Sequence, residues 1–134
     1  MTGPRQPAIE TVQPAGWMAA KGYANGMIAQ GRPLHVGGQI GWEPGGDRAG
    51  TFASTAFVDQ FARALDNVLA VVGAAGGRPE HVVRMTVYVT DVAAYRRSLP
   101  ELGAAWRARF GRHFPAMALV GVAALVHPDA AVEI

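Results

Sequence analysis

Residues 54–75 read STAFVDQFARALDNVLAVVGAA, an amphipathic pattern from which the rest of the fold can be inferred. Apolar side chains recur three or four residues apart, which places them in one stripe on a helix. Ser54 or Thr55 can cap the start of this helix, and Gly76-Gly77 supplies the left-handed stop that is typical of a helix C-terminus. The stripe consists of Phe57, Phe61, Ala64, Leu65, Val68, Leu69 and Val72.

The stretch that follows, HVVRMTVYV at residues 81–89, is rich in β-branched and aromatic residues and predicts a strand. Two sets of side chains alternate along it, so the strand has two unlike faces. One face carries Met85, Val87 and Val89, and the other carries Arg84, Thr86 and Tyr88.

A second helix is predicted after a turn at Thr90-Asp91. The sequence Ser98-Leu99-Pro100-Glu101 has the spacing of a capping box, with Ser98 at the cap and Glu101 three positions later. Apolar residues then share one face until Gly111 ends the helix. They are Leu99, Leu102, Trp106 and Phe110.

Strand-like runs occur at residues 34–40, 114–125 and 132–134. The order of strands, helix, strand, helix and strands predicts an α/β (α+β) fold in which two helices pack on one face of a mixed sheet. The last strand stops after three residues, which is unusually short and leaves open whether the natural chain extends beyond Ile134.

The composition predicts one domain that is not embedded in a membrane. The chain has 134 residues, of which 50% are hydrophobic and 16% are charged, enough for a single core. Residues 1–16 hold three prolines and no apolar period, so we expect a flexible arm followed by one domain at 17–134. There is no apolar run of the ~20 residues that span a bilayer, no secretory signal and no cysteine, which favours the cytoplasm.

The charged and chemically reactive residues exclude several classes of function. The net charge is only +2, and the densest basic group, at Arg107, Arg109 and Arg112, falls at a predicted helix end, where cations complement the helix dipole. Nucleic acid is therefore not the expected partner. The four histidines lie far apart without metal-ligand spacing, and neither a nucleotide-binding loop nor a serine-hydrolase elbow is present. No metal or cofactor is expected.

Five short segments, taken together, resemble one protein family. In order they are KGYANG (21–26), VGGQI (36–40), VYVTD (87–91), GRHFPA (111–116) and VEI (132–134). This ordered set resembles the Rid (YjgF) family of reactive-intermediate deaminases, over most of the chain from Tyr23 to Ile134.

The resemblance implies a chorismate-mutase-like fold and a homotrimer with three small-molecule clefts at the subunit interfaces. In the family these clefts take enamines or imines derived from amino acids and hydrolyse them to ketoacids and ammonia. The enzymes that do so carry an arginine directly after Phe-Pro-Ala, where its planar fork pairs with the substrate carboxylate. This chain has Met117 there, and methionine carries neither charge nor donor.

The resemblance also assigns candidate catalytic residues. Tyr23 matches the family tyrosine near the cleft, whose hydroxyl can donate to or accept from a ligand. Glu133 matches the glutamate that positions or activates water as a general acid or base. The alternatives from pattern alone are a loop aromatic that covers the core for Tyr23 and a solvent-facing strand residue for Glu133.

The expected substrate-binding wall comprises Gly37, Gly38 and Gln39, together with Met117. Trp42 could close this pocket or simply pack. We expect Tyr23, Gly37, Met117 and Glu133 to converge in one pocket whose wall is completed by a neighbouring subunit.

Three functions are compatible with these residues. The leading one is a divergent enamine or imine deaminase that acts on a substrate other than simple 2-imino acids. The others are a non-catalytic trimer that binds a small metabolite and, with little support, an endoribonuclease. A carboxylate substrate would still fit if Arg109 or Arg112 reached the cleft.

Overall fold

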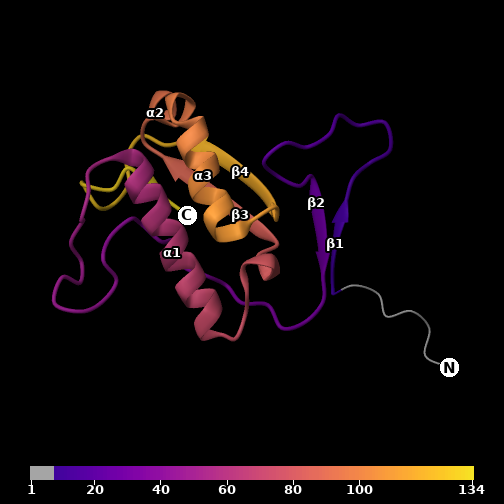
Figure 1. Ribbon diagram of the computed structural model, residues 1–134, viewed down its shortest axis with the longest axis horizontal. Helices are drawn as coiled ribbons and strands as arrows, with labels where there is room; N and C mark the ends of the chain where they lie inside the picture. The colour runs from indigo at the N-terminus through magenta and orange to yellow at the C-terminus, as the bar shows by residue number, and fades with distance from the viewer. Residues whose placement is uncertain (1–7) are drawn as a thin grey trace.

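A computed structural model describes residues 8–134 (Figure 1). Three helices and five strands follow one another, with a short 3-10 helix, η1, between α1 and β3. Their bounds are β1 Ile9–Val12, β2 Gly26–Ala29, α1 Phe57–Ala74, η1 Pro79–His81, β3 Arg84–Val89, α2 Val92–Arg97, α3 Leu99–Phe110, β4 Ala116–Gly121 and β5 Val132–Glu133. The mixed α/β character predicted from the sequence is confirmed.

Helix α1 forms where the apolar stripe predicts it, and it ends as expected. Gly76 has a φ of 82°, its N–H bonds the carbonyl of Gly73, and the N–H of Gly77 bonds that of Val72. This pair of bonds is the Schellman arrangement, which satisfies the last carbonyls of a helix. At the start, however, Ala56 is the N-cap residue, and the Ser54 hydroxyl instead accepts from the Ala56 N–H at 3.0 Å.

The capping box predicted at Ser98 is wrong. Ser98 does precede α3, but its side chain makes no cap hydrogen bond. An additional helix, α2, follows the predicted turn at Thr90-Asp91, and Asp91 caps it by accepting from the Ala94 N–H at 3.0 Å. Because α2 runs directly into Ser98, that residue adopts φ −110° and ψ 14° rather than the extended conformation of an N-cap.

This difference can be measured by alanine substitution. We expect Asp91→Ala to lower the free energy of unfolding by about 1 kcal/mol, because the helix loses its cap. Ser98→Ala should change that free energy by less than about 0.5 kcal/mol, since no cap bond is lost. Urea denaturation followed by circular dichroism gives both values. An equal or larger loss at Ser98 would show that the capping box forms after all.

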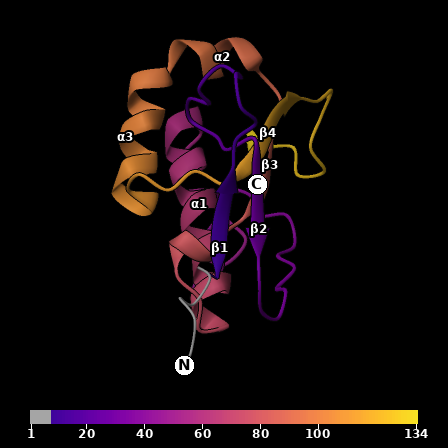
Figure 2. The same ribbon diagram turned by 90° about the vertical axis from the view of Figure 1, so that its right-hand side faces the viewer.

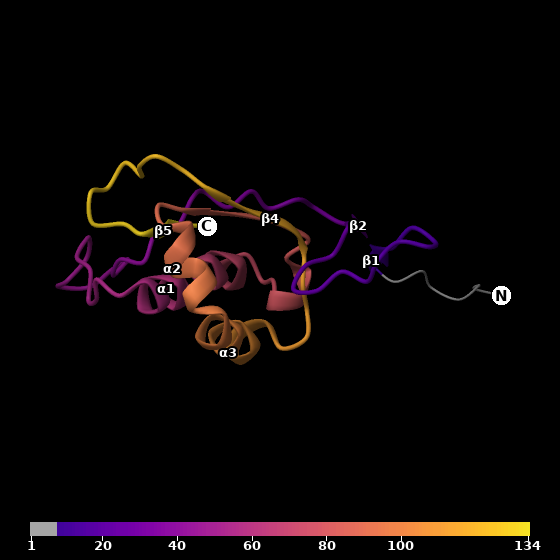
Figure 3. The ribbon, with the colours of Figure 1, turned by 90° about the horizontal axis from the view of Figure 1, so that it is seen from above.

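The main sheet has the strand order β4-β3-β5 and is mixed. β3 pairs with β4 in parallel, with Met85 opposite Met117, and with β5 in antiparallel, with Tyr88 opposite Glu133. All three helices found in residues 8–134 lie on one side of this sheet, and none of them covers its other face (Figure 3). We call this second side the uncovered face.

The N-terminal part of the domain differs from the expectation. Residues 9–12 of the predicted arm form β1, which pairs with β2 as an antiparallel hairpin at one end of the β3–β4 pair (Figures 1 and 2). Residues 1–7 lie outside the described residues. The strand predicted at residues 34–40 is reduced to one bridge, between Ile40 and Glu133, because Pro33 directly precedes the run and Gly37 and Gly38 interrupt it.

The core lies between the helices and the covered face of the sheet. Helices α1 and α3 pack against each other and against side chains of β3 and β5, and Arg109 of α3 forms a bidentate pair with Asp66 of α1 at 2.7 and 3.2 Å. The buried cluster consists of Phe61, Ala64, Leu65, Met85, Val87, Val89, Leu102, Trp106, Phe110 and Val132. Strand alternation therefore turns Arg84, Thr86 and Tyr88 toward the uncovered face.

Candidate functional site

Four of the five short segments that resemble the Rid family lie against one another in two pairs, each joined by backbone hydrogen bonds. The Ala24 N–H donates to the Pro115 carbonyl at 2.9 Å, and Ala24 forms a parallel bridge with Ala116. Tyr23 therefore lies beside the Phe-Pro-Ala segment. At the other side of the sheet, Gln39 and Ile134 exchange two backbone hydrogen bonds of 2.8 and 2.9 Å, which brings the Gly-Gly-Gln segment against β5.

Glu133 lies on the uncovered face, with its side chain over Gly38. A Cβ atom built on Gly38 would stand 2.0 Å from Glu133 Oε1 and 2.9 Å from its Cδ. No side chain larger than hydrogen fits there while Glu133 keeps this position. At Gly37, by contrast, a Cβ would meet no atom within 4 Å. Gly38 is thus the half of the Gly37-Gly38 pair that makes room for the carboxylate.

Tyr88 is the direct cross-strand neighbour of Glu133. Paired residues of an antiparallel ladder point to the same face, so the phenol ring and the carboxylate share the uncovered face. Both side chains reach solvent in one subunit, Tyr88 being 40% exposed and Glu133 half-buried.

Two buried amides on α1, which sequence reasoning missed, hold the segments that carry Glu133 and Gly38. Gln60 is 2% exposed; its Nε2 donates to the carbonyls of Ser54 and Asp129, and its Oε1 accepts from the Ala131 N–H at 2.7 Å. Asn67 is 3% exposed and donates to the carbonyls of Ile40 and Trp42.

The spacing of these two amides along the sequence is the signal from which their buried, hydrogen-bonded role could have been predicted. Gln60 and Asn67 are seven residues apart, so they lie on one side of α1, next to the apolar stripe. A polar residue in the buried sector of a helix must find partners. Here the partners are backbone groups of residues 129–131 and 40–42, the two segments that flank the Ile40–Glu133 bridge.

Met117 does not join these residues within one chain. Its register partner is Met85, which is buried, and Met117 itself is half-buried against the core cluster. Alternation along β4 thus directs Met117 toward the helices, while Ala116 and Ala118 point to the uncovered face. The expected convergence of Tyr23, Gly37, Met117 and Glu133 is not found in a single subunit.

Tyr23 and Glu133 are also far apart in one chain. Ala24 pairs with Ala116, which pairs with Arg84, whereas Glu133 pairs with Tyr88, four residues further along β3. At ~3.3 Å per residue and ~4.8 Å between strands, the two backbone positions are about 20 Å apart. One small molecule cannot touch both side chains in the same subunit.

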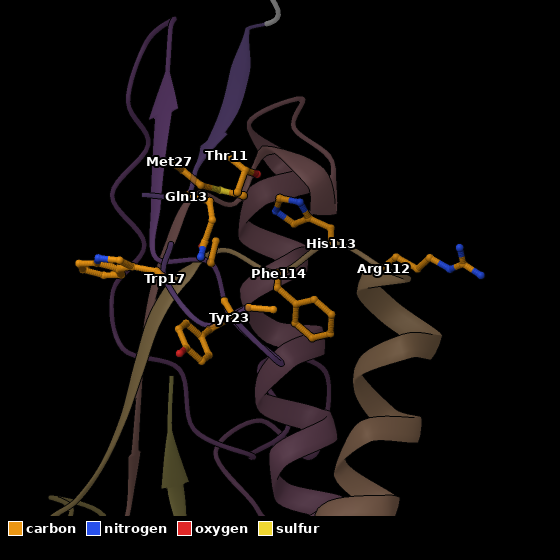
Figure 4. Close-up of a pocket in the computed structure, with 11 residues that line it drawn as sticks. Thr11, Gln13, Trp17, Tyr23, Met27, Arg112, His113 and Phe114 are labelled. Carbon is orange, nitrogen blue, oxygen red and sulfur yellow. The ribbon is translucent and has the colours of Figure 1, made fainter. Parts of the chain in front are cut away.

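A groove of about 470 Å³ surrounds Tyr23 (Figure 4). It runs between the loop that joins β1 to β2 and the segment after α3. The ring of Phe114 forms part of the wall and stacks on Trp106 with centroids 5.5 Å apart, so this wall is tied to the core. Glu133 is not among the residues that line this groove.

The contacts of Arg109 and Arg112 show whether either guanidinium is available to a ligand in the cleft. Arg109 is paired with Asp66, as described for the core, and is therefore occupied. Arg112 lines the groove, but its guanidinium points away from the other labelled side chains (Figure 4). Arg84 lies on the uncovered face four residues before Tyr88, and the sequence did not suggest it as an arginine that could bind a substrate carboxylate.

Three of the four histidines bind backbone groups. His81 Nδ1 accepts from the Arg78 N–H at 3.0 Å, His127 Nδ1 accepts from the Asp129 N–H at 3.1 Å, and His113 Nε2 lies 2.6 Å from the Val82 carbonyl. His127 also packs on Phe52 and Trp42, so Trp42 contacts a loop rather than the Tyr23 groove. Within residues 8–134, no three potential metal-ligating side chains gather.

A family model described as Endoribonuclease L-PSP matches residues 14–134, nearly the whole chain. The chain belongs to this family, the Rid (YjgF) family. Its fold is accordingly the YjgF fold, as the resemblance implied. A search of curated proteins returned no match.

Solved structures of Rid proteins superimpose on most of the chain. A Rid family protein of unknown function, YyfB from Yersinia pestis, is 26% identical with a TM-score of 0.79, and the match covers 94% of each chain. RidA from an Antarctic Psychrobacter is 28% identical with a TM-score of 0.63, over 92% of this chain and 94% of that one. The YjgF gene product of Escherichia coli is 32% identical with a TM-score of 0.58, over 79% and 82%.

No helix of this Rid protein, within the part of the chain that the structure describes, is long and apolar enough to cross a membrane.

Proposed function

We propose that this Rid protein is a homotrimer that hydrolyses an uncharged imine or enamine in clefts between its subunits. The observation that carries the proposal is the position of Glu133, a carboxylate over Gly38 on a sheet face that no helix covers. Tyr23 and Glu133 of one chain are too far apart for one ligand, so the proposed cleft takes Glu133 from one subunit and Tyr23 from the next.

The proposed reaction needs one general acid and base. The oxygen of a water molecule adds to the carbon of the C=N bond while the Glu133 carboxylate accepts a proton from that water and passes it to the nitrogen, which gives a carbinolamine. Glu133 then accepts the proton of the carbinolamine hydroxyl and delivers it to the nitrogen as the C–N bond breaks and the C=O bond forms. The products are a carbonyl compound and ammonia, so one imine and one water are consumed.

The preference for an uncharged substrate follows from the guanidinium groups. Position 117, where the resemblance places the carboxylate-binding arginine, holds a methionine that packs toward the core, and Arg109 is paired with Asp66. A substrate carboxylate would therefore lack its bidentate partner at that point. Losing such a pair in a desolvated site costs about 2–5 kcal/mol, or roughly 30- to several thousand-fold in rate.

Two imines generated in solution test this preference. A dehydratase acting on serine releases 2-iminopropanoate, and a flavin amine oxidase acting on benzylamine releases an imine without a carboxylate. We expect the protein to accelerate ammonia release from the second imine and to have a weak effect, or none, on the first. Rapid hydrolysis of 2-iminopropanoate would contradict the preference and would make Arg84 the residue to substitute.

The assembly is tested separately. The uncovered face presents Tyr88 and Val120, each about 40% exposed, and association would remove this apolar surface from water. We expect light scattering at micromolar concentration to give three times the 14.1 kDa mass of one chain. A monomer mass would contradict the proposal, because the cleft needs two subunits.

A further inference from the structure

The loop that joins β1 to β2 carries an exposed tryptophan. Trp17 is 63% exposed, and the neighbouring Met18 is 86% exposed. A chain of side-chain hydrogen bonds braces this loop: Asn25 Nδ2 donates to Gln13 Oε1 at 2.8 Å, and Gln13 Nε2 donates to the Met18 carbonyl at 3.1 Å. The tryptophan is thus presented by an ordered loop.

Trp17 and Tyr23 both line the groove, and the indole of Trp17 lies at its outer edge, directed away from Phe114 and His113 (Figure 4). Tyr23 is 40% exposed, so both rings offer a face to a ligand. The Phe114 ring, stacked on Trp106, forms part of the wall. A volume of about 470 Å³ is within the range of small-molecule pockets.

The charges around the groove favour a neutral ligand. Arg112 is the one Asp, Glu, Lys or Arg residue among the lining side chains, and its guanidinium points away from the groove. His113 uses its Nε2 atom for the Val82 carbonyl. The remaining polar groups are uncharged and include the hydroxyls of Thr11 and Tyr23.

We infer that this groove binds the planar, uncharged aromatic ring of a small molecule, with Trp17 as its specificity-determining residue. The indole face stacks on the ligand ring, and the Tyr23 hydroxyl hydrogen-bonds a polar substituent. This inference deepens the proposed function and rests on it in one respect, because Tyr23 belongs to both. It names the substrate class as aromatic rather than aliphatic.

Fluorine NMR of the full chain labelled with 5-fluorotryptophan tests the inference. The three tryptophans should give three resonances, and Trp17→Phe assigns the one from Trp17. We expect benzamide to shift the Trp17 resonance with a millimolar dissociation constant. Cyclohexanecarboxamide, which has the same substituent on a saturated ring, should bind about 3- to 10-fold more weakly because it cannot stack.

Two variants separate binding by the Trp17 ring from nonspecific binding to exposed apolar side chains. Trp17→Leu keeps an apolar side chain but removes the flat ring, and it should weaken benzamide binding about 3- to 10-fold when followed through Tyr23 chemical shifts. Val126→Ala, which truncates a fully exposed apolar side chain that does not line the groove, should leave binding unchanged.

Several outcomes would overturn the inference. Equal affinity for the two amides, or for wild type and Trp17→Leu, would remove the stacking role. A Trp17 resonance that a soluble relaxation agent cannot broaden in the assembled protein would show that a second copy covers the indole. Assays of the wild-type protein separate this failure from failure of the proposed function. Wild-type benzamide binding without any imine turnover refutes the hydrolase alone, whereas turnover without a Trp17 effect refutes the aromatic groove alone.

Discussion

Glu133→Gln is expected to lower hydrolysis of the neutral imine by about 100-fold or more, because positioned general acid–base catalysis contributes ~10²–10⁴ in rate. The amide keeps the shape of the carboxylate but cannot take a proton from water. Stability should change little, since Glu133 reaches solvent and no described side chain pairs with it. Ammonia release measured beside urea denaturation gives both values.

A matched pair of glycine variants tests whether the position of the carboxylate matters, as well as its charge. In Gly38→Ala the new methyl group overlaps Glu133 Oε1 and Cδ, and a flexible side chain can yield by turning away. We therefore expect a large loss of turnover with a change of less than about 1 kcal/mol in unfolding free energy. Gly45→Ala, at a loop glycine outside the proposed binding wall whose added methyl group meets nothing within 4 Å, should retain turnover.

The two possible failures have different meanings. Full turnover in Glu133→Gln would remove Glu133 from the chemistry and leave the protein as a ligand-binding trimer or as a hydrolase with another base. Full turnover in Gly38→Ala with none in Glu133→Gln would show that the carboxylate acts from a second position. In either case the Rid fold and the pairing of β3 with β5 are unaffected.

The elements predicted well from the sequence are those whose signal is local. α1 and β3 follow from apolar spacings of three to four and of two, and the glycine stop of α1 adopts the positive φ that such a stop requires. α2 was missed because six residues give too short a period. Ser98 was misassigned because its Ser-x-x-Glu spacing lies at the junction of two consecutive helices, where the end of α2 sets the backbone conformation of Ser98.

The candidate site could be predicted only in part, because its geometry depends on pairing between distant segments. The sequence shows which of the family segments are present. Only the structure shows that the Gly38 segment lies against Glu133 and that Tyr23 lies beside Phe-Pro-Ala. The direction in which the Met117 side chain points cannot be predicted from the family segments. It depends on the register of β4 against β3, and a shift of one residue would turn it to the other face.

The second large effect is expected at Gln60, whose side chain joins α1 to the segment before β5. Gln60→Leu keeps the volume of the side chain but leaves the carbonyls of Ser54 and Asp129 and the Ala131 N–H without their partners. Each buried polar group that loses its partner costs about 1–3 kcal/mol. Because Asp129 is exposed and water can serve its carbonyl, two groups lose their partner, and we expect a total loss of roughly 2–6 kcal/mol.

A loss of that size is a large fraction of the 5–15 kcal/mol that stabilises a typical domain. Urea denaturation of Gln60→Leu and of Gln30→Leu, the same substitution at an exposed glutamine, isolates the effect of the buried bonds. The second variant should change stability by less than about 0.5 kcal/mol. A cost below about 1 kcal/mol at Gln60 would contradict the prediction, because it would mean that residues 129–131 hold Glu133 in place without help from α1.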